Sequence, residues 1–215
     1  MFHVKQVRGD NLQNIKTFEL NGHCIEFIED NHVYIVDGLI VPCVSNILAH
    51  KFNDYAGVSK EILNRASELG SRMHHSIELY EKEGKESDLK EFRNYLFLKK
   101  YYKFKNLENE IPVIYEKDGQ VLYIGTLDQI IEIDGKLGIN DFKRVANPNK
   151  EKICYQVNLY KLAYEQTYNK KIDFLAFTQL REDVRKFTNL PINEEMTLKL
   201  LEEYLESREV WAKNY

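Results

Sequence analysis

The chain has 215 residues, of which 43% are hydrophobic and 12% aromatic, so it can bury the core of one globular domain and is not expected to be disordered. Its formal net charge of −4 argues against a protein that coats nucleic acid by bulk charge alone. There is no apolar run long enough to predict a membrane span, no secretory signal is recognisable, and three scattered cysteines indicate neither a zinc cage nor a disulfide framework, so the expected compartment is a reducing cytoplasm.

The first fifty residues predict a β-rich appendage. Segments 23–30 and 33–41 alternate apolar and polar residues, and turns are predicted at residues 30–31 and 37–38. A short helix is predicted after Pro42, with Ser45 as its N-cap. We expect residues 1–50 to form a hairpin or meander and residues 51–215 to form a single globular unit.

Two helices are predicted next. Apolar residues from Ile62 to Tyr80 recur at three- and four-residue steps, so one face of a helix over about 59–83 should be buried. A second helix is predicted over about 88–103.

The end of this second helix mixes lysines with aromatic rings, in the segment LKKYYKFK. One interpretation is a solvated helix end. The other is a surface that follows phosphates and stacks on bases, with Lys99, Lys100 and Lys103 as the candidate nucleic-acid contacts.

Three strands in a meander are predicted over about 112–144, because period-two alternation is interrupted by Asp-Gly turns at 118–119 and 134–135. The switch from helix to strand is placed at Pro112.

A helix is then predicted to begin near Asn147 or Asn149. An apolar strand over 172–180 should be buried, and an amphipathic helix is predicted over about 193–212. This order of elements predicts an α/β (α+β) fold, with a mixed central sheet flanked by helices and the N-terminal β appendage attached to it.

Chemistry is predicted at the second Asp-Gly hairpin. Strand alternation places Asp141 and Lys143 on one face, about 7 Å apart along the strand, and turns Phe142 towards the core. The antiparallel hairpin can bring Asp128 beside Asp141, and two adjacent carboxylates repel each other unless a cation such as Mg²⁺ or Mn²⁺ lies between them. A nearby lysine can position a water molecule and offset phosphate charge. Ordinary surface charge on a hairpin is the alternative interpretation.

Four short motifs occur in order along the chain: GSRMH (70–74), GTLD (125–128), DFK (141–143) and QVNLY (156–160). This series resembles the PD-(D/E)xK nuclease superfamily, and within it the RecB-type and phage exonuclease branch. The resemblance covers about residues 25–180. It implies a restriction-endonuclease-like fold and a nuclease that depends on Mg²⁺ or Mn²⁺.

The resemblance also implies residue roles. Asp128, Asp141 and the backbone carbonyl of Phe142 would bind the metal, and Lys143 would position water. His74 would be a further ligand or would assist nearby. The neighbouring His75 stays open as the functional histidine, although only His74 has the Gly-x-x-x-His spacing.

Further residues are assigned by the same resemblance. Gln156 would orient Lys143 or the phosphate, and Tyr160 would contact the DNA backbone or brace the site, unless it is simply a core residue. Arg144 departs from the Thr or Ser that is common after the lysine, and could add a phosphate contact. The last two candidates are acidic: Glu78 and Glu116 could support the site from nearby, and Glu78 could equally be a surface acid.

These observations lead us to expect a metal-dependent DNA nuclease, specifically a phage- or prophage-type exodeoxyribonuclease in recombination, replication or repair. The expected partners are double-stranded DNA with linear ends, a single-strand annealing or recombination protein, and further copies of the chain. An endonuclease of the same fold, a non-catalytic DNA-binding subunit and a structural protein are the alternatives. No iron–sulfur cluster is expected, because three scattered cysteines cannot supply four ligands.

Overall fold

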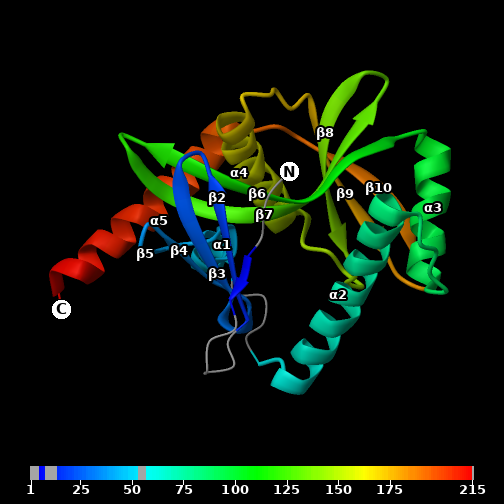
Figure 1. Cartoon of the computed structure of the whole chain (residues 1–215), viewed down its shortest axis with the longest axis horizontal. Coiled ribbons are helices and arrows are strands. Elements are labelled where there is room, and N and C mark those ends of the chain that lie inside the picture. The colour runs from blue at the N-terminus through cyan, green and yellow to red at the C-terminus, as the bar shows by residue number, and fades with distance from the viewer. Residues whose placement is uncertain (1–4, 8–13, 53–56, 215) are drawn as a thin grey trace.

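The computed structural model describes residues 5–7, 14–52 and 57–214, and this part of the chain forms two five-stranded sheets with helices around them (Figure 1). The first, called here the N-terminal sheet, is antiparallel throughout, in the order β1-β2-β3-β4-β5. Its strands are β1 (Lys5–Val7), β2 (Ile15–Leu20), β3 (His23–Ile28), β4 (Val33–Val36) and β5 (Leu39–Val41), with the 3₁₀ turn η1 (Glu29–Asn31) between β3 and β4.

The second sheet, called here the central sheet, is mixed and has the order β10-β9-β8-β7-β6. Its only parallel pair among the described strands is β8 with β9, and the helix α4 (Lys150–Tyr168) makes the crossover between them. The sequence did not predict the edge strand β10, whose residues are polar enough to suggest a loop. The strands are β6 (Lys105–Lys117), β7 (Gln120–Ile133), β8 (Lys136–Lys143), β9 (Phe174–Leu180) and β10 (Arg185–Leu190).

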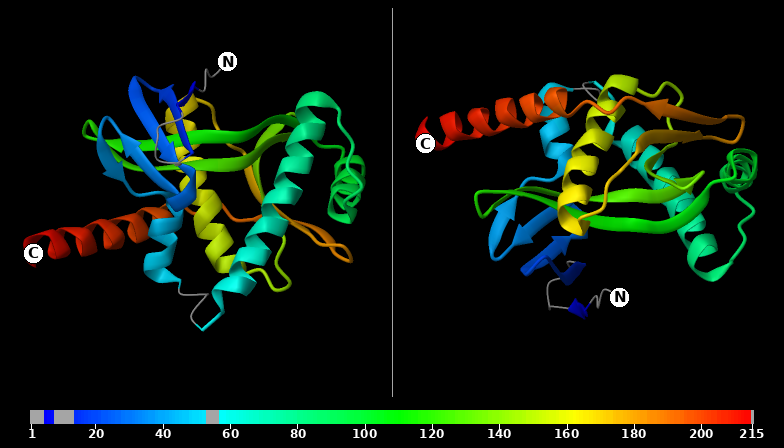
Figure 2. Two further views of the ribbon diagram at one scale, coloured as in Figure 1. Left: turned by 60° about the horizontal axis from the view of Figure 1, so that its bottom comes forward. Right: turned by 90° about the horizontal axis from the view of Figure 1, so that it is seen from above.

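The other helices are α1 (Val44–Lys51), α2 (Lys60–Glu83), α3 (Lys90–Tyr102) and α5 (Glu194–Asn214). Helices α1, α4 and α5 pack with the central sheet around one apolar cluster, and α2 and α3 share a second cluster with other residues of that sheet. Figure 2 shows α5 and the N-terminal sheet on opposite sides of β6 and β7. The mixed α+β fold expected from the sequence is therefore confirmed. Among the described helices, none has both the length and the apolar character needed to cross a membrane.

The helix starts follow local hydrogen bonding. Ser59 caps α2 by accepting the amide of Ile62, and Asn149 caps α4 in the same way. The prediction of Ser45 as the cap of α1 was wrong. The cap position is Cys43, whose amide donates to Asn46 Oδ1, and the helix begins at Val44, one residue before Ser45.

The predicted burial of α2 along its length was also wrong. Its buried residues are Met73, Ser76 and Ile77, all in the second half, whereas Ile62 is 63% exposed. The first turns extend away from both sheets (Figure 1). An amphipathic pattern shows which face can be buried, but burial also requires a neighbouring element, and the first half of α2 has none among the described residues.

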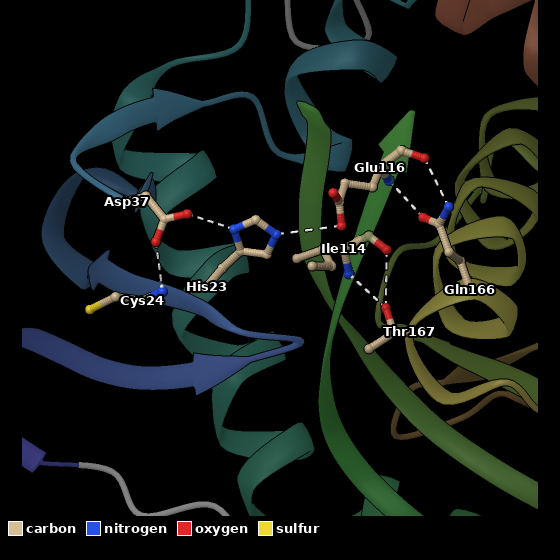
Figure 3. A network of polar contacts seen from close by, with 7 residues as sticks. All are labelled: His23, Cys24, Asp37, Ile114, Glu116, Gln166 and Thr167. Carbon is tan, nitrogen blue, oxygen red and sulfur yellow. Dashed lines mark hydrogen bonds and ion pairs between the residues drawn. The ribbon is translucent and has the colours of Figure 1, made fainter. Parts of the chain in front are cut away.

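Strand β6 begins at Lys105, well before the predicted switch at Pro112, and a proline is tolerated there because β6 is an edge strand. Side chains of α4 satisfy its outward-facing backbone groups (Figure 3). The hydroxyl of Thr167 accepts from the amide of Ile114 and donates to its carbonyl. The side-chain amide of Gln166 does the same for the amide and carbonyl of Glu116. The part of this edge near Ile114 and Glu116 is therefore closed to pairing with another strand.

The N-terminal sheet is fixed to the other side of β6 and β7. Ile25 and Tyr34 of that sheet share one apolar cluster with Ile114 and Ile124 of the central sheet. His23 adds a polar link, because its Nδ1 lies 2.6 Å from Asp37 and its Nε2 lies 3.4 Å from Glu116 (Figure 3). Helix α1 belongs to the core of the larger unit, through residues such as Val44 and Ile47.

The link through His23 should make stability depend on pH. The hydrogen bond to Asp37 and then the one to Glu116 outweigh burial and raise the pKa of His23 above its ordinary value. A group with a raised pKa stabilises the fold below its unfolded pKa of about 6.5, and this stabilisation is lost as the pH rises through the folded pKa. We expect the free energy of unfolding in urea to be larger at about pH 6 than at about pH 8.5, and His23→Gln to reduce that difference.

The matched control is His75→Gln, because the side chain of His75 is 67% exposed. This variant should keep the pH dependence of the wild type. An undiminished pH dependence in His23→Gln would show that the hydrogen bonds of His23 to Asp37 and Glu116 do not cause it.

Candidate metal centre

The candidate site begins where β7 and β8 stop pairing. Their antiparallel ladder ends at the pair Gln129–Asn140, and beyond it the amide of Phe142 donates to Asp128 Oδ2 at 2.6 Å instead of to a strand carbonyl. A buried chain of side-chain hydrogen bonds runs from Gln129 through Asn140 to Thr178 and links β7, β8 and β9 just below this point. These contacts fix the register that brings Asp128 next to Asp141, as the sequence predicted.

Asp141 and Lys143 lie on one side of β8 and form an ion pair, with Lys143 Nζ 2.5 Å from Asp141 Oδ2. Phe142 is turned the other way into the apolar core, which confirms the predicted alternation. Asp141 is only 1% exposed. Burial raises the pKa of its carboxyl, the Lys143 ammonium lowers it in part, and the nearby Asp128 raises it again.

His74 reaches the same place from α2. Its Nδ1 lies 3.7 Å from Asp128 Oδ1 and 3.7 Å from Glu110 Oε1, and its ring packs edge-on against Phe142. Burial alone would lower the pKa of His74. The carboxylates of Asp128 and then Glu110 outweigh burial and raise this pKa to about 9. His75 points elsewhere, with its Nδ1 3.7 Å from Glu78. Of the two neighbouring histidines, the structure therefore places His74 at the site.

Glu110 completes a group that could hold a metal ion. The ligand atoms of His74, Glu110 and Asp128 all lie within 4.8 Å of one another. One imidazole nitrogen and two carboxylate oxygens suit Mn²⁺ and, with added water, Mg²⁺. Glu110 has a left-handed backbone, with φ of 51°, inside strand β6. Such strain in a non-glycine residue is typical of functional sites.

The other proposed ligands are engaged differently. The carboxylate of Asp141 adjoins this group but is held by Lys143. The backbone amide of Phe142 contacts Asp128, and the role of its backbone carbonyl as a metal ligand stays a prediction.

Glu110 was not predicted as a site residue because the strand was expected to begin at Pro112, and a one-residue irregularity in the β6–β7 hairpin also shifts its position. Near the turn, Glu116 pairs with Val121, and continuing that register would place Asn109 opposite Asp128. The register shifts beside Tyr115, so that Asn109 pairs with Gln129 instead and Glu110 falls opposite Asp128. Counting residues back from the turn at 118–119 could have pointed to this part of β6, but a regular register would have selected Asn109 instead of Glu110.

Tyr160 lies on α4 beside the two aspartates. It is 7% exposed, and burial, then Asp128 and Asp141, raise the pKa of its hydroxyl well above the ordinary value. Gln156, one turn earlier on α4, forms a hydrogen bond with it. The glycine of the GTLD motif makes room for the ring: a Cβ at Gly125 would lie 2.8 Å from Tyr160 Cε1.

Gly125→Ala should therefore displace Tyr160 from the aspartates. We expect a loss of stability of about 1–3 kcal/mol from overpacking. Gly70→Ala is the matched control for stability, because a Cβ at Gly70 meets nothing within 4 Å and should stabilise α2 by about 0.5–1 kcal/mol. Thermal or urea unfolding of the two variants tests this pair, and equal stability of both would contradict the packing argument.

Two of the predicted acidic residues lie away from the metal ligands. Glu78 is on the wall of the cleft described below, where it pairs with Lys82 at 2.6 Å. Glu116 is bound to His23, at the junction with the N-terminal sheet.

The predicted basic residues are also spread out. Arg144 donates to Glu91 at 2.7 Å and lines a separate cavity of about 340 Å³. Lys99 is held by Glu81 at 2.6 Å, and Lys100 and Lys103 lie at the exposed end of α3. The lysine-rich segment is therefore outside the metal centre.

The metal centre opens into a cleft of about 1450 Å³ between the N-terminal sheet and α2. Strands β6 and β7 contribute to it near Glu110 and Asp128, and Tyr160 lines it as well. The N-terminal sheet supplies further lining residues: Lys16, Phe18, Phe27, Glu29, His32 and Tyr34. A bound molecule in this cleft would contact the candidate metal ligands and the N-terminal sheet together.

No family model and no curated protein matches this chain. Among solved structures, the chain is similar to one described as "Crystal structure of SSO0001", with 15% identical residues and a TM-score of 0.46, over 77% of this chain and 75% of that chain. This likeness carries no functional information, so the chemistry of the site is judged from its own geometry.

Proposed function

We propose that this protein is a divalent-metal-dependent deoxyribonuclease. The observation that carries the proposal is the group formed by His74, Glu110 and Asp128, which lies beside the buried ion pair of Asp141 with Lys143 and opens into a large cleft. Acidic clusters alone are common on protein surfaces. A lysine held next to such a cluster by a buried carboxylate is a more specific arrangement, and it suits hydrolysis of a phosphodiester.

When bound to His74, Glu110 and Asp128, Mg²⁺ or Mn²⁺ would lower the pKa of a water molecule and neutralise phosphate charge. The chain supplies the remaining functions. Asp141 holds the ammonium of Lys143 where it can donate to the attacking water or to a phosphate oxygen. Tyr160 carries its proton near neutral pH, and burial raises its pKa further, so its hydroxyl can donate to the phosphate. In the overall reaction water oxygen bonds to phosphorus, the bond to O3′ breaks, and the leaving oxygen takes up a proton.

Within this activity we propose digestion from the ends of linear DNA, in the cytoplasm of a bacterium or of a phage-infected host. Support comes from the series of four motifs, which is similar to that of phage exonucleases. The same resemblance supports a single-strand annealing or recombination protein as partner, and association of several copies of the chain.

The test is cleavage of end-labelled linear DNA and of closed circular DNA, each with Mg²⁺, Mn²⁺ or EDTA. Asp128→Asn is the matched control, because an asparagine oxygen can still accept the Phe142 amide while the charge is lost. Metal-dependent loss of linear DNA alone, abolished by the substitution, is the expected result. Nicking of circles would indicate an endonuclease, and no cleavage by folded protein would refute the proposal.

A further inference from the structure

The wall of the cleft opposite α2 is the inner face of the N-terminal sheet. Lys16 pairs with Phe27 across β2 and β3, and Phe27 pairs with Tyr34 across β3 and β4, so the three side chains form one row on one face. The rings of Phe27 and Tyr34 are stacked with centroids 4.4 Å apart, and His32 packs edge-on against Phe27 at 5.1 Å. All of these side chains line the cleft.

These rings are held rigidly from behind. Tyr34 is 2% exposed and its hydroxyl lies 3.1 Å from Thr126 Oγ1 on β7. Phe27 and Phe18 are partly buried and pack against the apolar cluster that joins the N-terminal sheet to the central sheet. Their remaining surface lies at the cleft, where fixed aromatic rings offer flat faces on which other rings can stack at little entropic cost.

The charges of the cleft are wrong for a surface that follows a phosphate backbone. The described lining includes only two lysines, and each is neutralised locally: Lys16 lies 2.5 Å from Glu29, and Lys82 lies 2.6 Å from Glu78. The acidic residues of the lining outnumber them: Glu29, Glu78, Glu81, Glu108, Glu110 and Asp128. A double helix, with two phosphate backbones, would be repelled more strongly here than one strand that presents its bases.

We propose that the cleft binds the unpaired end of a single DNA strand, with bases stacked against Phe27 and Phe18 and one phosphate directed to the metal centre. This assignment rests on the proposed nuclease function and specifies its substrate. The N-terminal sheet acts as the stacking surface, while the metal centre offsets the negative charge of the phosphate. A linear duplex would enter through frayed or recessed ends.

The test measures fluorescence anisotropy of a labelled oligothymidylate in Mg²⁺, using Lys143→Ala so that the strand is not degraded. An abasic strand of equal length and a blunt duplex are the comparison ligands. The oligothymidylate should bind about tenfold more tightly than the abasic strand, and Phe27→Ala should remove most of that advantage. Phe27→Tyr should keep it, because the aromatic face is preserved.

Two control variants test whether the effect of replacing Phe27 comes from lost stacking. One distinguishes it from a loss of folding, and the other from the loss of an aromatic ring elsewhere on the protein. Phe27→Leu fills the same apolar space without a ring, so it should melt like the parent protein and still lose the preference for bases. Phe97→Ala removes a ring that is 46% exposed on α3, outside the cleft, and should leave binding unchanged. Equal binding of the abasic strand, a preference for blunt duplex, or full binding by Phe27→Leu would overturn the proposal.

Failure of this inference can be distinguished from failure of the nuclease function. Metal-dependent cleavage by the wild type, without any effect of the Phe27 variants on binding, would keep the nuclease and overturn the stacking wall. Base-dependent binding that requires Phe27, in a wild-type protein that cleaves nothing, would support the strand-binding cleft and refute the nuclease.

Discussion

Lys143→Ala is expected to lower metal-dependent cleavage of DNA by about 10²–10³-fold, the effect of removing one fixed electrostatic donor from an active site. The ammonium of Lys143 is fixed by Asp141 close to His74, one of the candidate metal ligands, and its side chain is 22% exposed, so it is not sealed from solvent. Its loss also leaves the buried Asp141 carboxylate without this ion pair, and we expect a lower melting temperature as well. Single-turnover cleavage at saturating Mg²⁺, corrected for the folded fraction, measures the effect.

Lys100→Ala is the matched control, because this lysine is exposed on α3 outside the cleft. It should cleave at the wild-type rate. If Lys143→Ala also cleaved at the wild-type rate, Lys143 would have only a structural role in its ion pair with Asp141.

Glu110→Gln should weaken Mn²⁺ binding and lower cleavage by about 10–100-fold, a loss of the size seen when groups that support metal sites are replaced. Glutamine keeps the shape of the side chain but removes a charge that faces both His74 and Asp128. Isothermal titration with Mn²⁺ gives the affinity, and cleavage at saturating Mn²⁺ separates binding from later steps.

Glu116→Gln is the natural comparison, since it changes the same residue type on the same strand at the position that the sequence had suggested. Its carboxylate lies against His23, so the variant should keep full Mn²⁺ affinity and lose only part of the stability of the junction with the N-terminal sheet. The reverse result, with Glu116→Gln defective and Glu110→Gln intact, would show that Glu110 is not a metal ligand.

The part of the site that depends on short-range geometry was predictable from sequence. The turn at 134–135 fixes the register of β7 and β8 without an irregularity, so Asp128 was correctly placed beside Asp141. Strand alternation correctly placed Lys143 with Asp141 and turned Phe142 to the core.

The part that depends on irregular or long-range geometry was not predictable. Glu110 reaches the site only because the β6–β7 register shifts by one residue near Tyr115. The cleft wall formed by Phe27 results from packing between two sheets, and no local pattern specifies it. Strand β10 pairs with β9 through backbone hydrogen bonds, which its mostly polar side chains do not reveal.

Helix α2 is one continuous helix whose two halves have different surroundings. Among residues 60–68, only Leu63 is even half-buried, whereas Met73 and Ile77 are almost fully buried. A helix without tertiary contacts is only marginally stable in water, so amide hydrogen exchange should be fast at the start of α2 and slow near its middle. His74 lies just where this protection begins. The candidate metal ligand His74 is thus carried by the rigid half of α2, and fraying of the outer turns should leave the geometry around Glu110 and Asp128 unchanged.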